Sequence, residues 1–358
     1  MRALPPPVRN VPTPLALALA AALLAGCGSS PAPAADRPVS PSPAAVASPA
    51  ASAAPSAVVK PVVKAVVGDP LTGRPKAPGG SVVAVKIDNS PLARPYHRGL
   101  DEASVIYQEL MEGGSSRFLA IYAPATGNEV GPVRSVREGD LELLQQYGKV
   151  ALAGSGGNTG VLATFAQAAK EGRVLDANFE VLPGPYRRAE RRRDAYNFFT
   201  SPQKIDQAKP GGAKVKDVGL RFGPLAPTAG FPAQTVSVSF SPISRVRVEY
   251  DPKGGRYAVY QDGDRMKDYA PTNVVVQQTK ITNSRYVDVV GNPTPFTTTI
   301  GSGSVTVLRD GRRLSGTWRR LVGDTGTRFL DDKGRDLPLK PGATLVLLVP
   351  AGRSLQVG

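Results

Sequence analysis

Acidic, amide and arginine side chains are concentrated between residues 88 and 137, where they alternate with apolar segments. We take as a candidate pocket the polar members of this stretch, which are Asp88, Asn89, Glu109, Glu112, Arg117, Arg134, Ser135 and Arg137. Glu109 and Glu112 stand at the end of a predicted strand, and two such carboxylates could act as the acid and the base of glycan cleavage. The alternative, which we favour, pairs both with the nearby arginines. An arginine lowers the pKa of a neighbouring carboxyl group, which is unfavourable for a general acid at neutral pH.

Two arginines in the segment 131–137 suggest a second kind of chemistry. Arg134 and Arg137 are three residues apart and can share one face of a helix that begins here, and Ser135 could cap that helix. Two guanidinium groups beside a helix N-terminus suit a carboxylate or phosphate ligand. They could equally hold the two glutamates internally, and both interpretations stay open. In either case we expect the arginines to converge with at least one glutamate around one pocket at the start of the helix.

Other catalytic and cofactor chemistries find little support in the sequence. His97 is the only histidine and lies in a loop bounded by Pro and Gly, which argues against a Ser-His-Asp triad and against zinc. The glycine-rich loop Gly154–Gly160 lacks the lysine of a P-loop, so a plain connection is the favoured interpretation. Trp318 is expected in the core. We therefore predict no metal and no cofactor.

The N-terminus has the order of features that is typical of a lipoprotein signal. Arg2 and Arg9 precede an apolar run from Leu15 to Ala25, and small residues then lead to Cys27, the only cysteine. The run is shorter than the about 20 residues that a membrane-spanning helix needs. We predict that residues 1–26 are a cleaved signal peptide. Cys27 would then carry the acyl chain that anchors the protein at the outer face of the bacterial cytoplasmic membrane.

Composition and charge indicate the surroundings of the mature protein. Residues 27–66 carry the predicted anchor and then consist largely of Pro, Ala, Ser and Val, which is typical of a tether that buries little. The formal net charge of +15 at pH 7 falls to +13 once the two arginines of the signal are removed. An exported protein of this charge meets anionic lipids and wall polymers before any nucleic acid. We expect the membrane, a cell-wall polymer or an envelope protein as partners, and no nucleic acid.

A high density of Pro and Gly between residues 209 and 232 predicts a boundary near Thr228. Residues 67–228 are expected to form an α/β domain with a mixed sheet covered by helices, and residues 229–358 a mainly β domain, so that the class is α+β. The expected strands are Ser81–Ile87, Ser104–Tyr107, Arg117–Tyr122, Val236–Phe240, Val246–Tyr250, Asn273–Gln278, Ser304–Leu308, Ser315–Arg319 and Thr344–Val349. The expected helices are Glu138–Lys149 and Thr159–Glu171, the second with Thr159 as its N-cap and Gly172 as its stop.

Several of these segments resemble the YerB-like bacterial lipoproteins, a family with DUF3048 N- and C-terminal domains of unknown function. The segments that carry the resemblance are Val85–Asn89, Glu109–Phe118, Gly131–Arg137, Gly301–Gly303, Gly316–Trp318 and Pro341–Pro350. The resemblance covers nearly everything after residue 80 and implies a two-domain envelope lipoprotein, but it implies no reaction. In the family a histidine often stands where this chain has Gly154–Gly157, and a Pro-His-Asn run where it has Ala195–Asn197. If those histidines are catalytic in the family, this member lacks them.

The leading interpretation is a lipid-anchored binding or accessory module for an anionic or glycan ligand of the cell wall. The alternative is a peptidoglycan-acting enzyme that uses Glu109 and Glu112. Catalysis requires one of these carboxylates in an open cleft without a committed cationic partner, whereas a binding or structural role allows both to be buried in pairs.

Overall fold

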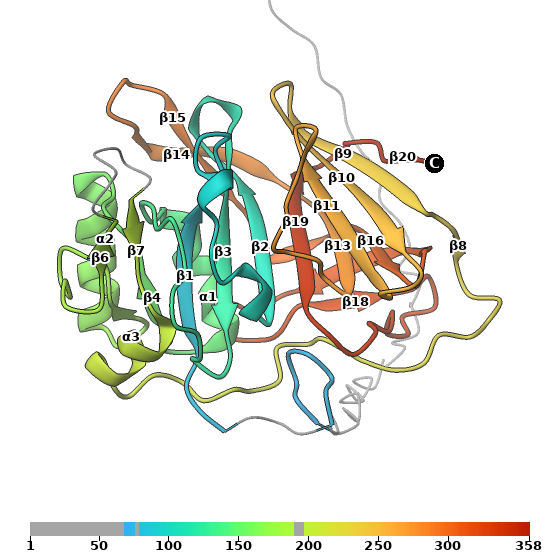
Figure 1. Ribbon diagram of the computed structural model, residues 1–358, viewed down its shortest axis with the longest axis horizontal. Helices are drawn as coiled ribbons and strands as arrows, with labels where there is room; N and C mark the ends of the chain where they lie inside the picture. The colour runs from blue at the N-terminus through green and yellow to red at the C-terminus, as the bar shows by residue number, and fades with distance from the viewer. Residues whose placement is uncertain (1–67, 76–78, 190–196) are drawn as a thin grey trace, which may run out of the picture. The chain divides into compact units, whose positions relative to one another are not determined.

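The computed structural model describes residues 68–75, 79–189 and 197–358 (Figure 1). The predicted signal peptide, Cys27 and the tether lie outside the described residues. None of the helices in the described part has the length and apolar character that crossing a bilayer requires.

The first half of the described chain alternates short strands with helices, and its class is the predicted α/β. Its strands are β1 (Val83–Asp88), β2 (Val105–Leu110), β3 (Ser116–Tyr122), β4 (Ala151–Ala153), β5 (Leu175–Asp176), β6 (Arg187–Arg188) and β7 (Phe198–Phe199). Its helices are α1 (Glu138–Leu144), α2 (Thr159–Lys170) and α3 (Pro202–Ala208), with 3-10 turns η1 (Arg94–Tyr96), η2 (Leu100–Glu102), η3 (Glu112–Gly114) and η4 (Gln145–Tyr147).

The second half consists of strands, as the alternation of apolar residues predicts. They are β8 (Phe231–Pro232), β9 (Thr235–Ser241), β10 (Ser244–Asp251), β11 (Arg256–Gln261), β12 (Asp264–Arg265), β13 (Asn273–Thr279), β14 (Ile281–Val287), β15 (Pro293–Thr297), β16 (Gly301–Arg309), β17 (Arg312–Arg320), β18 (Arg328–Leu330), β19 (Thr344–Pro350) and β20 (Gln356–Val357). The predicted glycine turn joins β10 to β11, and Gly255 there has a φ of 64°. Glycine adopts this left-handed conformation without the strain that other residues meet.

One mixed sheet of eleven strands runs through both halves of the described residues, in the order β18-β17-β16-β13-β19-β2-β3-β1-β4-β5 with β8 beside β17. The late strand β19 pairs in parallel with β13 on one side and with β2 on the other, so that Thr344 stands opposite both Asn273 and Val105. In Figure 1 the red β19 accordingly lies next to β2 of the first half. The predicted boundary at residue 228 therefore separates segments whose strands share one sheet.

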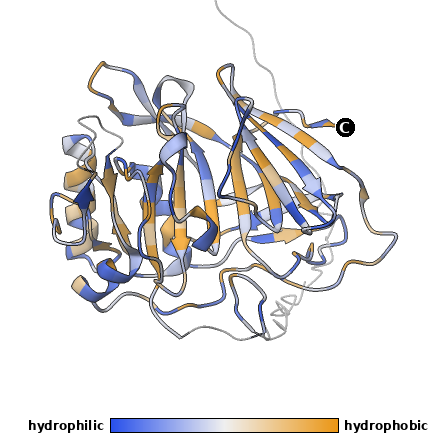
Figure 2. Ribbon diagram, viewed as in Figure 1, coloured by the Kyte–Doolittle hydropathy of each residue, from blue (hydrophilic) through white to orange (hydrophobic). Residues whose placement is uncertain are grey.

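The two faces of this sheet carry different layers. Alternate residues of β1 point to opposite faces: Val83 and Val85 pack against the apolar side chains of β9, β10 and β11, whereas Ala84 packs with those of α1 and α2. Strands β9, β10, β11, β12 and β20 form a second sheet of five strands among the described residues. Figure 2 shows the apolar residues running along the strands that these layers enclose. Trp318 is 2% exposed and lies in the core, as expected.

Both predicted helices form, but their ends differ from the expectation. The first ends at Leu144 and continues only as the turn η4, since Gly148, with a φ of 85°, leaves the helical conformation. The N-cap of α2 is Asn158 and not Thr159, because the Asn158 side chain accepts the hydrogen bond from the Gly160 amide. Asn is as good an N-cap residue as Thr, so the sequence did not decide which of these two adjacent residues caps the helix.

Candidate functional site

Apart from Asn89, which bonds Ser116 on the opposite face, the candidate residues lie at one end of the large sheet, on the face that α1 and α2 cover. Val105 and Tyr107 of β2 pack on this face, and the alternation of the strand places Glu109 there as well. Asp88 ends β1 on the same face as Ala84, and Arg117 stands opposite it on β3. The segment that leads into α1 then supplies the two arginines of the predicted motif.

Glu112 forms a two-pronged ion pair with Arg137. The Arg137 Nε and Nη2 atoms donate to the two carboxylate oxygens at 2.6 and 2.8 Å, and Thr294 Oγ1 donates to Oε1 at 2.6 Å. Burial alone would raise the pKa of Glu112, but these hydrogen bonds and the arginine charge lower it to about 2. The carboxylate is thus ionised at neutral pH and fully occupied as an acceptor.

Glu109 has a different partner, which is Lys86 of β1. The Lys86 ammonium contacts Glu109 and lies 2.5 Å from Asp140 Oδ1 of α1, and the three residues are 0–3% exposed. Burial raises the pKa of Glu109, with Lys86 opposing the rise and Asp140 adding to it. Glu109 and Asp140 are thus buried against one shared ammonium group.

Arg134 pairs with Asp88, and its side chain is the more exposed of the two motif arginines. Its Nε lies 2.8 Å from Asp88 Oδ2, and 30% of the side chain is exposed, compared with 11% for Arg137. The buried Arg117 donates to the Ser135 carbonyl at 2.9 Å. Burial, together with the charges of Arg137 and Arg134, lowers the pKa of Arg117 to about 9, so its guanidinium remains protonated at neutral pH.

The remaining candidates serve local structure. Asn89 donates to Ser116 at 2.9 Å, and Ser135 donates to the carbonyl of Ser155 at 3.2 Å. Ser135 therefore does not cap α1, although the sequence suggested that it could. Arg137 occupies the N-cap position, and Asp140 accepts the hydrogen bond from the Arg137 amide at 2.7 Å.

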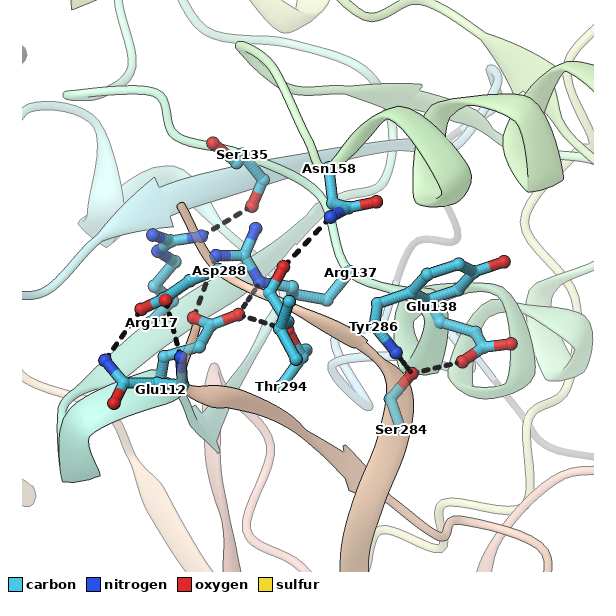
Figure 3. Close-up of polar contacts among 12 residues, drawn as sticks. Glu112, Arg117, Ser135, Arg137, Glu138, Asn158, Ser284, Tyr286, Asp288 and Thr294 are labelled. Carbon is cyan, nitrogen blue, oxygen red and sulfur yellow. Dashed lines mark hydrogen bonds and ion pairs between the residues drawn. The ribbon is translucent and has the colours of Figure 1, made fainter. Parts of the chain in front are cut away.

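The hairpin β14–β15 of the second half covers this end of the helices (Figure 3). Besides the Thr294 contact, Ser284 donates to Glu138 at 2.6 Å and Asn158 donates to the carbonyl of Val287 at 2.9 Å. Gly160 in α2 leaves room for Tyr286, because a Cβ at that position would lie 2.4 Å from its ring. The hairpin therefore contacts Glu112 through Thr294 and reaches both α1 and the N-cap of α2.

The expectation that the arginines and a glutamate meet in one pocket is met only by Arg137 and Glu112. Arg134 pairs with Asp88, and Glu109 contacts Lys86, so among the described residues the expected arginine–glutamate pair is the one between Arg137 and Glu112. The physical reason is the strand register: Asp88 ends β1 beside the segment that carries Arg134, whose amide donates to the carbonyl of Lys86.

Three residues were missing from the predicted set, namely Lys86, Asp140 and Thr294. Lys86 could have been found, since it is two residues before Asp88 in the same predicted strand and must share its face. Asp140 could have been found as the acidic residue three after a helix start. Thr294 is distant in sequence, and no local signal indicates it. We call Lys86, Glu109, Asp140, Glu112 and Arg137 the paired cluster.

His97 and the glycine-rich loop, which the sequence analysis also considered, form hydrogen bonds within the fold. The His97 ring lies 7% exposed, and its Nε2 donates to the carbonyl of Asp88 at 2.7 Å. Burial lowers the pKa of His97 to about 4, so the ring is neutral. Two backbone amides of the loop Gly154–Gly157 donate hydrogen bonds to side chains. The Gly154 amide donates to the Tyr186 hydroxyl, and the Gly156 amide donates to the Glu180 carboxylate. Within the part of the chain that the structure describes, no three His, Cys, Asp or Glu side chains gather as metal ligands would.

Comparison with known proteins identifies relatives of this chain. Residues 71–214 match the family described as "Protein of unknown function (DUF3048) N-terminal domain", and residues 236–346 match the DUF3048 C-terminal domain. "Putative lipoprotein YerB" of Bacillus subtilis (strain 168) is 27% identical over 294 residues, which cover 78% of this chain and 86% of that protein. A crystal structure of YerB protein from Bacillus subtilis aligns with a TM-score of 0.65 at 24% identity, over 81% of this chain and 99% of that chain. At this identity the likeness to the crystal structure supports the fold alone.

Proposed function

Because the chain belongs to the DUF3048 family of YerB-like proteins, whose activity is not established, we propose its function from its own residues. It is a lipid-anchored protein of the cell envelope whose folded body binds an anionic or glycan ligand of the cell wall and does not cleave it. The observation that carries the proposal is the complete commitment of Glu109 and Glu112 to cationic partners.

The anchor is the first part of the proposal. The relative from Bacillus subtilis is described as a lipoprotein, and in this chain Cys27 follows a short apolar run and small residues. Replacing Cys27 by Ala removes the only thiol that can receive an acyl chain. We expect Cys27→Ala to leave the protein soluble or unprocessed in cell fractionation, with the unaltered chain in the membrane fraction as control. A variant that is cut normally and stays with the membranes contradicts the anchor.

Binding is favoured over cleavage by the state of the two glutamates. A general acid must reach the glycosidic oxygen and carry a proton there. The Glu112 carboxylate is held ionised by Arg137, and Glu109 is 3% exposed behind Lys86. Neither carboxyl group is therefore free to act as the acid of a retaining or inverting hydrolysis. This is the arrangement that the binding interpretation allows and the enzyme interpretation does not.

The ligand contact that we propose is the exposed side of Arg134. Its guanidinium is held by Asp88, and its backbone carbonyl accepts from the amide of Ser155 in the loop that leads to α2. A part-exposed guanidinium suits a phosphate or carboxylate. The strongly basic chain adds long-range attraction for a polyanion such as an anionic wall polymer.

Cosedimentation with purified cell walls tests this proposal. The probes are peptidoglycan that carries its anionic polymer and the same peptidoglycan from which the polymer has been removed. We expect the unaltered chain to prefer the first probe, to lose binding as salt rises, and to weaken about tenfold in Arg134→Gln but not in Arg134→Lys. The control is Arg256→Gln, which removes an exposed arginine on β11. Equal sedimentation of Arg134→Gln and the unaltered chain contradicts the contact, and release of soluble glycan fragments contradicts the absence of cleavage.

A further inference from the structure

A cavity of about 450 Å³ lies away from the paired cluster, between two segments that are distant in sequence. One wall comes from Pro91 to Leu100, after β1, and the other from Asp264 to Tyr269, which comprises β12 and the residues after it. This volume lies in the range that small-molecule sites occupy. Neither the proposed wall contact nor the predicted candidate pocket includes it.

The inner surface of this cavity, which we call the β12 pocket, is largely apolar. Leu100, Met266 and the ring of Tyr269 are buried in it at 2%, 7% and 4% exposure, and Pro91 and Pro95 stand on the opposite side. Apolar walls with few polar groups are typical of sites for small organic ligands, because burial of the ligand's apolar surface drives binding.

The rim of the β12 pocket carries cations. Arg98, Arg265 and Lys267 are exposed, and within the described ranges no carboxylate lies within ion-pair distance of any of them. Two acids stand on the same rim: Asp264 lies 3.8 Å from Arg94, and Asp268 is exposed. The cations therefore exceed the acids at the opening, and a negatively charged group is attracted there.

The two walls are fixed to each other without a ligand. Arg94 donates from Nε to the carbonyl of Asn89 at 3.1 Å and from Nη1 to the carbonyl of Gln261 at 2.9 Å, and it pairs with Asp262. His97 holds the same wall to the end of β1 through the Asp88 carbonyl. A site that is held open in this way loses little conformational entropy on binding.

We propose that the β12 pocket binds a small amphipathic anion of the alkyl phosphate type. Its apolar body occupies the cavity, and its phosphate lies at the rim among Arg98, Arg265 and Lys267. Such a group could arrive as a free molecule or as the headgroup region of a membrane lipid, and the two sources share this chemistry. The proposal stands independently of the wall contact at Arg134.

Calorimetric titration of the mature chain with Cys27→Ser, so that no acyl group competes, tests the site. The probes are monomeric n-octyl phosphate, 1-octanol and inorganic phosphate. We expect octyl phosphate to bind most tightly, because only it offers both the apolar body and the charge. The double variant R265E/K267E should weaken its binding about tenfold or more, and D268N should strengthen it.

The control variant is K253E/R256E, which makes the same change of charge on the turn between β10 and β11 and should bind as the unaltered chain does. Thermal unfolding of all variants checks that they fold. The source of the ligand is distinguished with phosphatidylcholine vesicles with and without phosphatidic acid. Vesicle binding that R265E/K267E abolishes identifies a lipid headgroup, and binding of the monomer alone identifies a free ligand. Failure to bind octyl phosphate, or equal loss in the control variant, overturns the proposal.

Discussion

The charged side chains of the paired cluster have ionic partners within the described part of the chain, whereas Arg265 and Lys267 at the rim of the β12 pocket have none. In the paired cluster, Glu112 has three donors and Glu109 is buried against Lys86. In the β12 pocket, Arg265 and Lys267 are exposed beside an apolar cavity and form no ion pair with any described residue. Groups whose hydrogen bonds are complete within the chain stabilise the fold, whereas groups left incomplete beside a cavity remain for a ligand.

The two regions also differ from what the sequence suggested about where a ligand site lies. The stretch from Asp88 to Arg137 carries the candidate charges that the sequence singles out, yet Asp88, Glu109 and Glu112 each have a cationic partner in the fold. The segment Asp264–Tyr269 looks like an ordinary turn and strand, yet it contributes half of the cavity wall. Density of charge along the chain is thus a weaker guide to a site than the lack of a partner in the fold.

The largest effect in this comparison is expected from Lys86→Ala. The substitution leaves the carboxyl groups of Glu109 and Asp140 buried without a cation, and breaking a buried pair in this way costs about 3–5 kcal/mol. We expect the free energy of unfolding, measured by urea denaturation, to fall by that amount. Lys253→Ala, at an exposed lysine, serves as control and should change it by less than about 0.5 kcal/mol. A loss for Lys86→Ala as small as that of the control would mean that the paired cluster is not a stabilising element.

A smaller and graded effect is expected from reversing the two motif arginines. Arg137→Glu places a second carboxylate against Glu112 beneath the hairpin, and we expect it to destabilise the fold by about 3 kcal/mol. Arg134 is 30% exposed and paired with Asp88, so Arg134→Glu should destabilise it by about 1 kcal/mol, which is still more than a typical surface change. Urea denaturation of both variants provides the comparison. Equal effects, or a neutral Arg134→Glu, would show that exposure does not rank these two pairs.

The smallest effect is a dependence of stability on pH. The folded pKa of Glu109 is raised by burial above its unfolded value, so the stability that its protonated form contributes is present at low pH and is lost as pH rises through the folded pKa. We expect the free energy of unfolding to fall by on the order of 1 kcal/mol between about pH 5 and pH 8. Glu109→Gln, which cannot ionise, should remove this part of the slope. If the free energy of unfolding depends on pH with the same slope in Glu109→Gln and in the unaltered chain, the raised pKa of Glu109 is contradicted.

Glu112 has the opposite sign and gives an internal comparison. Its folded pKa is lowered to about 2, chiefly by Arg137, so its contribution is present above its unfolded pKa and is lost as pH falls toward the folded value. The same denaturation series, extended to acid pH, should therefore separate the two glutamates.

Much of the fold followed from local pattern. Alternating apolar residues predicted β1, β3, β9, β10, β13, β16, β17 and β19 near their observed bounds, and helical spacing predicted α1 and α2 to within a few residues at their ends. The burial of Trp318 was also predicted. These features depend on neighbours within a few positions, and the chain itself specifies them.

The partners of the candidate residues could be predicted only in part. Arg137 and Glu112 met as expected, since both lie where a strand or a helix ends near the same edge. Arg134 pairs with Asp88, and Glu109 with Lys86, because of the register between β1, β2 and β3. Register is fixed by long-range packing of a whole face, and no spacing along one strand reveals it.

The sequence by itself determined the basic charge and the type of most secondary-structure elements, because each of these depends on local composition or order, and the predictions of a lipid anchor at Cys27 and of a tether rest on it alone. Only the tertiary structure decided that β19 lies between β2 and β13, that Thr294 covers Glu112, and that residues 91–100 and 264–269 enclose one cavity. These arrangements join segments separated by about seventy positions or more. Their free energy comes from the burial of surfaces that meet only after folding, so no local signal can carry them.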